Sequence, residues 1–532
     1  MPKSKFIFVT GGVTSSLGKG IIASSLGNLF QSRGYKTTII KLDPYLNVDP
    51  GTLNPYEHGE CYVTDDGSET DLDLGHYERF LNISTSHLNN VTSGAIYQSV
   101  IEKERNGDFL GKTIQVIPHI TDEIKSRISS LEKNGKFKII IVEIGGTVGD
   151  IESLPYIEAL RQFKFERKKD VSVIHLTLLP YLSSSGELKT KPTQHSVKTM
   201  LQSGVQPDII VCRSKISIDT KVKDKIALFC NVNKESVIEA LDADTIYKVP
   251  LMMLEQKLDL VVANKLGLKK INNIDNGLWL KRIKRLKSSK KTFNVGIIGK
   301  YVELKDSYIS IHESLVHASA FLGFQLNIRW IQSDELNSQN VKRKIDNCDG
   351  VVVAPGFGSR GIDGKLIGVE HIRKNKIPFM GICLGMQVAV IEFARNVCKL
   401  KNAHSTEIDS KTKFPVIDIM ANQHAVTKMG GTMRLGGYSC KLKLKTKAYE
   451  IYKKEIIFER HRHRYELNND FRKILSENGM VFSGVNDELD LVEMIEIKNH
   501  PWFIGVQFHP EYKSKFVEPH PLFISFVESL NK

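Results

Sequence analysis

An apolar segment at residues 377–380 runs directly into a glycine-flanked turn at residues 381–385, Gly-Ile-Cys-Leu-Gly, and the apolar residues 388–394 follow it. Glycines on both sides of a nucleophile-type residue are typical of a tight strand-to-helix turn, which lifts one side chain above a sheet and places backbone N–H groups beside it. The pattern predicts an α/β fold in this region and makes Cys383 a candidate nucleophile. A small buried cysteine at a strand end is the alternative interpretation.

Two residues near the C-terminus could complete a nucleophilic site. An apolar segment at residues 502–508 ends at His509, and Glu511 follows two positions later. Side chains two positions apart on an extended segment point the same way, so Glu511 can orient the ring of His509 toward a nucleophile. A loop that contains Gly356 follows another predicted strand and can present an N–H group to an oxyanion. The order of these parts resembles that of a class I glutamine amidotransferase.

The N-terminal half begins with a second strand, loop and helix. Apolar residues 6–9 lead into a loop rich in Gly and Ser that ends at Lys19, and a helical pattern follows at residues 21–30. Small residues let backbone N–H groups cradle phosphate, while the helix N-terminus and the lysine add positive charge. Five residues separate Gly12 from Gly18, one more than in the standard loop, and Gly20 stands where a magnesium-binding Ser or Thr is usual. We therefore expect phosphate binding here, with magnesium ligands from elsewhere in the chain.

Two acids could supply those ligands. Asp73 belongs to an Asp-Leu-Asp pattern at residues 71–73, and Glu143 ends an apolar run that resembles a Walker B strand. Either acid alone would more often be a solvated loop residue or a helix cap, but beside a glycine-lysine loop they predict a nucleoside triphosphate site with Mg²⁺. Two lysines with Thr and Gln at residues 186–195 suit a second anionic ligand, and a solvated charged loop explains them equally well.

Composition limits the class of protein. Hydrophobic residues make up 41% and charged residues 25% of the 532 positions, as in soluble globular proteins. No apolar run approaches the length of a membrane span and no signal-peptide pattern precedes residues 6–9, so we expect a cytoplasmic protein without a membrane partner. The seven cysteines include no Cys-x-x-Cys pair, which argues against a structural zinc site. A net charge of +14 suggests nucleic-acid binding as a hypothesis, but the sequence contains no nucleic-acid recognition motif beside it.

Long runs of this sequence resemble the CTP synthase family, the glutamine-dependent enzymes that aminate UTP. The runs in the N-terminal half are residues 9–20, 41–45, 47–52, 71–80, 142–153 and 189–196. Those in the C-terminal half are residues 381–387, 402–407, 430–436, 459–466 and 509–511. The resemblance covers the chain from about residue 6 to residue 526. One departure lies in the oxyanion loop, where Pro355 stands in place of a glycine and removes an N–H donor.

The resemblance implies two doubly wound, mostly parallel α/β domains. We assign residues 1–268 to a P-loop NTPase-like amidoligase domain that binds ATP and UTP, and residues 293–532 to a class I glutamine amidotransferase domain. The charged segment at residues 269–292 reads as the linker between them. Each domain would contribute one of the two half-reactions.

In the amidotransferase domain the resemblance implies a glutaminase site. Cys383 would attack the side-chain amide of glutamine with the help of His509 and Glu511, and the N–H groups of Gly356 and Leu384 would face the oxyanion. The other residues that would hold glutamine are Gly385, Met386, Gln387, Glu407 and Arg464. Ammonia released there would aminate UTP that ATP has phosphorylated.

The resemblance also implies the nucleotide contacts. ATP would be held by Ser16, Leu17, Gly18, Lys19, Gly20, Ile21, Asp73, Leu241, Asp242 and Ala243, with Asp73 and Glu143 on Mg²⁺ and without an organic prosthetic group. UTP would contact Ser15, Lys189, Thr190, Lys191, Pro192, Thr193, Gln194 and Lys225. The product CTP would act as an inhibitor through Asp150, Ile151 and Glu152. The family further implies GTP as activator, a homotetramer, an ammonia passage lined by His58, and a lid at Leu110 and Gly111.

Two other functions remain open from the sequence. A different amidoligase, acting on a cofactor carboxylate, could use the same two parts, although the runs at residues 71–76 and 189–195 favour UTP. A structural or nucleic-acid-associated ATPase could use the phosphate loop alone. The second alternative leaves Cys383, His509 and Glu511 without a role.

Overall fold

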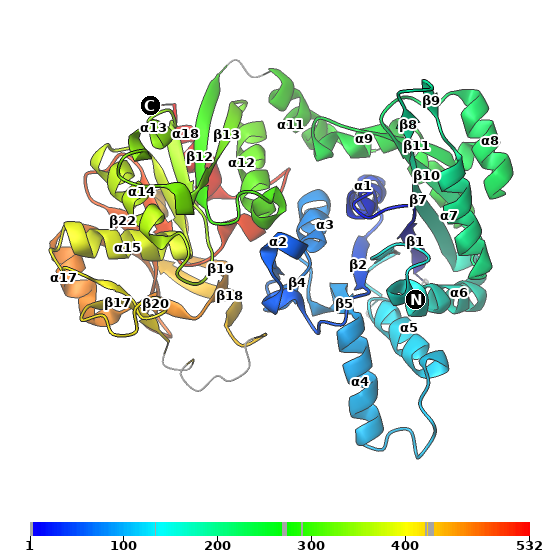
Figure 1. Cartoon of the computed structure of the whole chain (residues 1–532), viewed down its shortest axis with the longest axis horizontal. Helices are drawn as coiled ribbons and strands as arrows, with labels where there is room; N and C mark the ends of the chain where they lie inside the picture. The colour runs from blue at the N-terminus through cyan, green and yellow to red at the C-terminus, as the bar shows by residue number, and fades with distance from the viewer. Residues whose placement is uncertain are drawn as a thin grey trace. The chain divides into compact units, whose positions relative to one another are not determined.

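The computed structural model describes residues 4–133, 135–268, 274–288, 291–420, 423 and 430–531. The chain forms two compact units (Figure 1). The first unit comprises Met1–Asp49 and His76–Gly277, and the second comprises Pro50–Gly75 and Leu278–Lys532. Each unit is built on a large sheet with packed helices, so the expected α/β fold class is confirmed. No helix among the described residues is long and apolar enough to cross a membrane.

The first unit contains a seven-stranded parallel sheet in the order β11-β10-β7-β1-β6-β2-β5. Its strands are β1 (Lys5–Gly11), β2 (Thr37–Asp43), β5 (Asn90–Thr92), β6 (Ile139–Ile144), β7 (Val171–Leu179), β10 (Ile209–Ser214) and β11 (Val237–Leu241). Strand β1 lies between β6 and β7 and is apolar on both faces, as expected for a central strand of a parallel sheet. The loop after β1 therefore opens at the middle of the carboxyl edge, where such sheets bind ligands.

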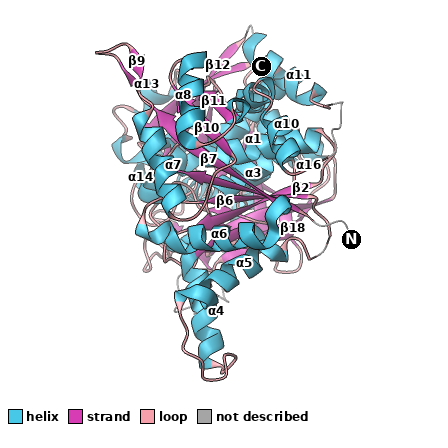
Figure 2. Cartoon of the chain, turned by 90° about the vertical axis from the view of Figure 1, so that its right-hand side faces the viewer, coloured by secondary structure: helices cyan, strands magenta, loops and turns pink. Residues whose placement is uncertain are grey.

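Helices cover both faces of this sheet. The helices of this unit are α1 (Lys19–Ser32), α3 (Asp73–Leu81, from His76 onward), α4 (Ser93–Arg105), α5 (Thr121–Ser130), α6 (Leu154–Arg167), α7 (Lys191–Gln202), α8 (Thr220–Cys230), α9 (Val249–Glu255) and α10 (Leu258–Lys265). Helices α6 and α7 pack on β7, whereas α1 packs on β2 and β6 (Figure 2). The two groups lie on opposite faces because right-handed crossovers to the two sides of β1 place their helices on opposite faces.

The second unit contains a nine-stranded sheet in the order β13-β12-β14-β15-β23-β22-β21-β18-β19. Its strands are β12 (Thr292–Gly299), β13 (Gln325–Gln332), β14 (Gly350–Val353), β15 (Phe379–Ile382), β18 (Arg434–Leu442), β19 (Ile456–His463), β21 (Met480–Asn486), β22 (Leu491–Ile497) and β23 (Phe503–Val506). The first five strands in the sheet order are parallel, and those from β22 onward are antiparallel. Strands β14, β15 and β23 thus end at one edge.

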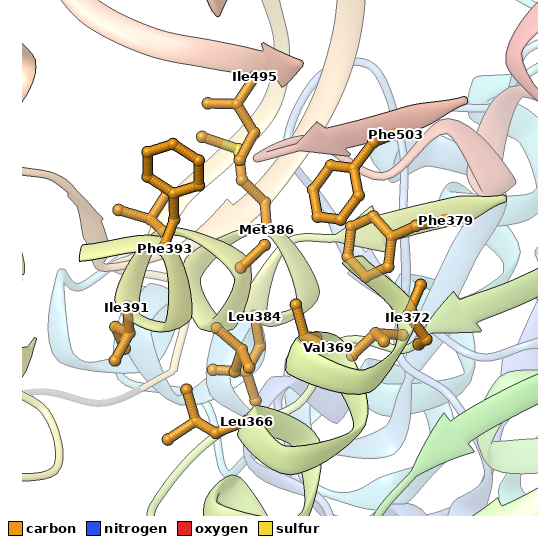
Figure 3. Packing of buried hydrophobic residues seen from close by; sticks show 14 of the residues in the cluster. Leu366, Val369, Ile372, Phe379, Leu384, Met386, Ile391, Phe393, Ile495 and Phe503 are labelled. Carbon is orange, nitrogen blue, oxygen red and sulfur yellow. The ribbon is translucent and has the colours of Figure 1, made fainter. Parts of the chain in front are cut away.

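Two helices, α14 (Ile362–Lys374) and α15 (Leu384–Asn396), close the core beneath that edge (Figure 3). The rings of Phe379 and Phe503, on neighbouring strands, stack with centroids 4.0 Å apart, and Met386 and Phe393 of α15 pack with them in one buried cluster. The other helices of this unit are α2 (Pro55–His58), α11 (Gly277–Ser288), α12 (Ile309–Leu322), α13 (Val341–Ile345), α16 (Lys447–Tyr452), α17 (Arg472–Glu477) and α18 (Pro521–Ser529). This packing fixes the start of α15 relative to β15.

The basic segment after residue 274 is largely helical. In α11 the apolar Trp279 and Ile283 are buried, and the Trp279 ring meets Phe516 edge-on at 4.7 Å between centroids. The guanidinium of Arg282 lies 4.3 Å from the centre of the Phe321 ring. The basic residues of this helix therefore accompany an apolar face that packs within the second unit.

The segment Pro50–Gly75 is held in the second unit by Arg460 of β19. The fully buried guanidinium of Arg460 pairs with Asp65 at 2.7 Å and donates to the hydroxyl of Tyr62 at 2.9 Å and the carbonyl of Val63 at 3.1 Å. The segment itself forms a two-stranded sheet of β3 (Tyr62–Val63) and β4 (Glu69–Thr70). A buried arginine with partners on all sides ties this segment to the nine-stranded sheet.

We expect Arg460→Ala to destabilise the second unit by about 2–4 kcal/mol, because it leaves buried acceptors without a donor. The midpoint of urea unfolding, followed by tryptophan fluorescence, measures this change. All three tryptophans, Trp279, Trp330 and Trp502, lie in the second unit, so the signal reports on that unit alone.

The matched control is Arg472→Ala. Arg472 pairs with the exposed Asp490 at 2.7 Å, and a pair of this kind contributes below about 1 kcal/mol. Equal shifts in the two variants would contradict the anchoring role of Arg460.

Candidate active sites

Cys383 sits at the turn between β15 and α15 in a backbone conformation that L-residues rarely adopt. Its φ is 50° and its ψ is −105°, and its N–H donates to the carbonyl of Val506 at 2.7 Å. A Cβ on Gly385 would lie 2.2 Å from the carbonyl oxygen of Val353, and one on Gly381 would lie 2.8 Å from the backbone of Gly385. Glycine is therefore required at both positions, because main chains approach closely there. The strained backbone conformation is that of Cys383, the candidate nucleophile.

His509 and Glu511 form a buried pair. Nδ1 of His509 lies 2.8 Å from Oε1 of Glu511. The expected extended geometry is wrong, because residues Pro510–Lys513 form a 3₁₀ turn, which proline favours at its first position. The turn still directs Glu511 to the imidazole, and it also stacks the ring of Tyr512 on His509 with centroids 4.9 Å apart and planes 8° apart.

The electrostatics of this pair suit a proton acceptor. Burial alone would lower the pKa of His509, but the negative charges of Glu511 and of a Cys383 thiolate outweigh it and raise the pKa to about 10. The imidazole of His509 interacts directly with the thiol of Cys383, so it can take the thiol proton. The arrangement lets the imidazole of His509 accept the proton of the Cys383 thiol and then stabilise the thiolate that forms.

A cavity of about 420 Å³ lies beside these residues, wholly within the second unit. Among the predicted residues, Gly356, Cys383, Arg464, His509 and His58 line it. Pro355 and Phe357 of the oxyanion loop also line it. The structure therefore brings the candidate nucleophile, its base and the oxyanion loop to one cavity, together with the residue expected along an ammonia passage.

The remaining residues predicted to hold glutamine have defined partners. Oε1 of Glu407 accepts the N–H of Gly358 at 2.7 Å, and burial raises the pKa of this carboxyl. The guanidinium of Arg464 donates to Thr432 at 2.8 Å. The side-chain amide of Gln387 donates to the carbonyl of Tyr465 at 2.8 Å, so this side chain ties the start of α15 to the segment at Tyr465. The first turn of α15, Leu384 to Met386, offers its helix N-terminus beside Cys383.

In the first unit the loop after β1 has the geometry of a phosphate cradle. Val13, Ser16 and Gly18 all have positive φ, at 78°, 57° and 90°. The ammonium of Lys19 donates to the carbonyl of Gly146 at 2.8 Å. A Cβ on Gly12 would lie 1.8 Å from Oγ of Ser196, so the loop rests directly on α7.

A cavity of about 160 Å³ adjoins this loop. It brings together predicted ATP contacts from both ends of the first unit, namely Leu17, Gly18, Ile21, Leu241, Asp242 and Ala243. Arg213 crosses the cavity mouth, because it donates to the carbonyl of Ser16 at 3.1 Å and pairs with Asp242 at 3.2 Å. A neighbouring space of about 320 Å³ is lined by Ser15 and Ser16 and by Lys215.

The predicted UTP contacts gather around the start of α7. Lys189 pairs with Glu187 at 2.6 Å, and the hydroxyl of Thr190 accepts the amide of Gln194 at 3.0 Å. The hydroxyl of Thr193 donates to the carbonyl of Leu178 at 3.1 Å. Helix α7 starts at Lys191 with Pro192 in its first turn, and Lys225 lies on α8. Asp150, Ile151 and Glu152 lie exposed before α6, and Leu110 and Gly111 lie in an exposed turn after α4.

The two candidate metal ligands differ in setting. Glu143 is buried at the end of β6, where the ammonium of Lys41 pairs with it at 3.0 Å and the hydroxyl of Tyr77 donates to it. Asp73 is the first residue of α3. No group of three His, Cys, Asp or Glu side chains that could hold a metal occurs in the part of the chain that the structure describes.

Sequence reasoning missed several residues at these sites. Lys300 donates to the oxyanion loop, Tyr512 stacks on His509, and the segment that carries Tyr62 lines the cavity beside Cys383. Lys300 directly follows β12, so its place at a strand end was a usable signal. Tyr512 and Tyr62 had no local signal, because they meet only in the folded unit.

Two family models match separate parts of this chain. The model of the CTP synthase N-terminus matches residues 5–268, and the model of class-I glutamine amidotransferases matches residues 303–529. The CTP synthase of Christiangramia forsetii is 60% identical over 533 residues, covering 100% of this chain and 98% of that protein. The CTP synthase of Flavobacterium johnsoniae is 58% identical over 528 residues, covering 99% and 98%. The solved glutaminase domain of a Trypanosoma brucei CTPS with bound acivicin is 35% identical, with a TM-score of 0.43, and covers 45% of this chain and 94% of that one.

We expect Glu511→Gln to lower the pKa of His509 from about 10, because it removes the carboxylate that stabilises the imidazolium. The thiolate of Cys383 then loses its partner as the pH rises toward neutrality. Alkylation of Cys383 by iodoacetamide, followed by mass spectrometry between pH 5 and 9, should slow about tenfold or more at pH 7. An unchanged alkylation rate would contradict this account of the pair, and the Cys383→Ala variant identifies the labelled peptide.

Proposed function

Because this chain belongs to the CTP synthase family, we propose that its two candidate sites divide the amination of UTP between them. The chain is a ligase of pyrimidine nucleotide synthesis that converts UTP to CTP with ATP and glutamine. The observation that carries the residue assignment is the strained Cys383 turn beside the His509 and Glu511 pair in one cavity.

Glutamine hydrolysis takes place at Cys383. Its thiolate attacks the side-chain amide carbon of glutamine, and the N–H groups of Gly356 and Leu384 stabilise the oxyanion. His509 gives its proton to the departing ammonia, and then activates a water molecule that hydrolyses the thioester. Glutamine itself is held by the carboxylate of Glu407, the guanidinium of Arg464 and the start of α15, residues Gly385 to Gln387.

Amination takes place at the nucleotide sites of the first unit. The oxygen on C4 of UTP leaves poorly, so transfer of the ATP γ-phosphoryl group to it creates a leaving group that ammonia displaces. The loop from Ser16 to Ile21 holds the phosphates of ATP, with Lys19 as the cation, and Leu241 to Ala243 contact the adenine. Ser15, Lys189 to Gln194 and Lys225 hold UTP.

Glu143 and Asp73 are the two carboxylates that would hold Mg²⁺, an ion that in nucleotide sites keeps several waters and takes only one or two protein carboxylates. When bound it neutralises charge on the transferring phosphoryl group. Lys41 and Tyr77 hold the Glu143 carboxylate in place for it.

Further properties belong to the same proposal. CTP inhibits through Asp150, Ile151 and Glu152, GTP activates, and the chain works as a homotetramer in the cytoplasm. Ammonia leaves the glutaminase cavity past His58, and Leu110 and Gly111 form a lid. The synthetase domain spans residues 1–268, the linker residues 269–292 and the amidotransferase domain residues 293–532, with Pro50–Gly75 packed in the second unit.

Cys383→Ala should abolish CTP formation from glutamine, by more than about 10³-fold, because no other thiol replaces the nucleophile. Ammonia-driven CTP formation should stay within about twofold of the parent enzyme, since the nucleotide sites are intact. The measurement is the absorbance change of CTP formation with ATP, UTP and Mg²⁺, and either glutamine or an ammonium salt. Equal loss of both activities would overturn the division into two sites.

Lys19→Met should reduce CTP formation from either nitrogen source by more than about 10²-fold, because the cation on the ATP phosphates is lost. Hydrolysis of glutamine should persist. Lys198→Met, on the exposed side of α7, serves as the matched control and should retain full activity. Loss of only the glutamine-driven activity in Lys19→Met would contradict the assignment of the phosphate loop.

A further inference from the structure

Two fully buried lysines lie beneath the oxyanion loop, residues 354–358. The ammonium of Lys300 donates to the carbonyls of Phe357 at 2.6 Å and Gly358 at 2.9 Å. The ammonium of Lys365, on α14, donates to the carbonyl of Ala354 at 2.6 Å. Both side chains have no exposed surface. Burying a lysine against neutral carbonyls is costly, so these contacts need an explanation.

Lys300 is itself held tightly. Its N–H donates to the hydroxyl of Tyr308 at 3.1 Å. Its carbonyl accepts the hydroxyl of Tyr56 at 2.9 Å, the guanidinium of Arg360 at 2.6 Å and the amide of Gln332 at 3.3 Å. The position of the ammonium under the loop is thus fixed by groups from several elements, one of which is the segment Pro50–Gly75.

The lysine also lies close to the proposed oxyanion donors. A Cβ on Gly356 would lie 3.2 Å from Cε of Lys300 and 3.6 Å from Cδ2 of Leu384. The Lys300 side chain therefore passes directly behind the peptide that presents the N–H of Gly356. Because Pro355 offers no N–H, the orientation of this single loop donor matters more here than in a loop with two glycines.

Charged groups of both signs surround Lys300. Glu407 and Asp334 favour its ammonium form, while Arg360 and the neighbouring Lys365 oppose it, and the hydroxyls of Tyr56 and Tyr308 face its main chain. Burial is the largest influence and lowers the pKa of Lys300 to about 8. Below that pH the site contains a positive charge that water does not screen.

We propose that Lys300 is a positioning residue for glutamine hydrolysis, whose ammonium holds the carbonyls of Phe357 and Gly358 so that the N–H of Gly356 faces the oxyanion. Its charge also stabilises the negative oxygen of the tetrahedral intermediate across the loop. This inference rests on the proposed roles of Cys383 and Gly356. The oxyanion loop would then need, besides the N–H of Gly356, a buried cation that holds its carbonyls.

The test compares Lys300→Met, Lys300→Arg and the exposed control Lys374→Met in the full-length enzyme. For Lys300→Met we expect kcat for glutamine hydrolysis to fall about 30-fold or more, with KM for glutamine within about threefold, because the lost interaction acts in the transition state. Tryptophan fluorescence, which reports on the second unit, shows whether the variant is folded. Alkylation of Cys383 by iodoacetamide should keep its rate, since Lys300 acts on the oxyanion and not on the thiol.

The pH dependence separates positioning by charge from simple packing. Lys300 loses its proton as the pH rises through about 8, so glutamine hydrolysis by the parent enzyme should decline above that pH. In Lys300→Arg the guanidinium stays charged, so the decline near pH 8 should disappear even where the overall rate is lower. The comparison of pH profiles between the parent enzyme and Lys300→Arg remains informative even if Lys300→Met does not fold.

Three results would overturn the proposal. These are an unchanged kcat in Lys300→Met, a change confined to KM, and a decline near pH 8 that persists in Lys300→Arg. Failure of the proposed function is distinguishable, because Cys383→Ala would then still use glutamine. Loss of glutamine use in Cys383→Ala with normal Lys300 variants would reject only the role of Lys300.

Discussion

The close approach of two main chains at the Cys383 turn is the constraint on which the glutaminase site depends. Gly385 lies so near the carbonyl of Val353 that no side chain fits between them. The contact presses the first turn of α15 against the end of β14, and β14 leads directly into the oxyanion loop. One steric contact therefore sets both the strained conformation of the nucleophile and its distance from the loop that serves it. The stacked core of Phe379 and Phe503 below prevents the turn from relaxing.

The two sites handle negative charge in different ways. The proposed phosphate site would meet a permanent anion, and it combines Lys19 at the start of α1 with Arg213, which is partly exposed at the cavity mouth. The proposed glutaminase site would meet a charge that exists only during the reaction, and its proposed positioning cation, Lys300, is buried beside the oxyanion loop. An exposed cation attracts substrate from solution, whereas a buried one acts only on what already lies in the cavity.

The sequence predicted the local structure of the candidate sites well. The Cys383 turn, the phosphate loop and the strand ends at Glu143 and His509 each depend on neighbours within a few positions, so spacing and residue type predicted them. The contact between His509 and Glu511 was predicted correctly, but the extended backbone expected to produce it was wrong, because the segment that begins at Pro510 forms a turn. Lys300, Tyr512 and the packing of Pro50–Gly75 escaped prediction, since their partners lie far away in the chain and no periodic pattern links them.

The location of Pro50–Gly75 in the second unit has a consequence for synthesis of the protein. Asp65 leaves the ribosome 395 positions before its partner Arg460, and Tyr62 precedes Tyr512 by 450. The first unit can fold around its sheet while this segment still has no partners. The wall of the glutaminase cavity is closed only when almost the entire chain has emerged. A nascent or truncated chain can therefore fold the first unit long before the wall of the Cys383 cavity is complete.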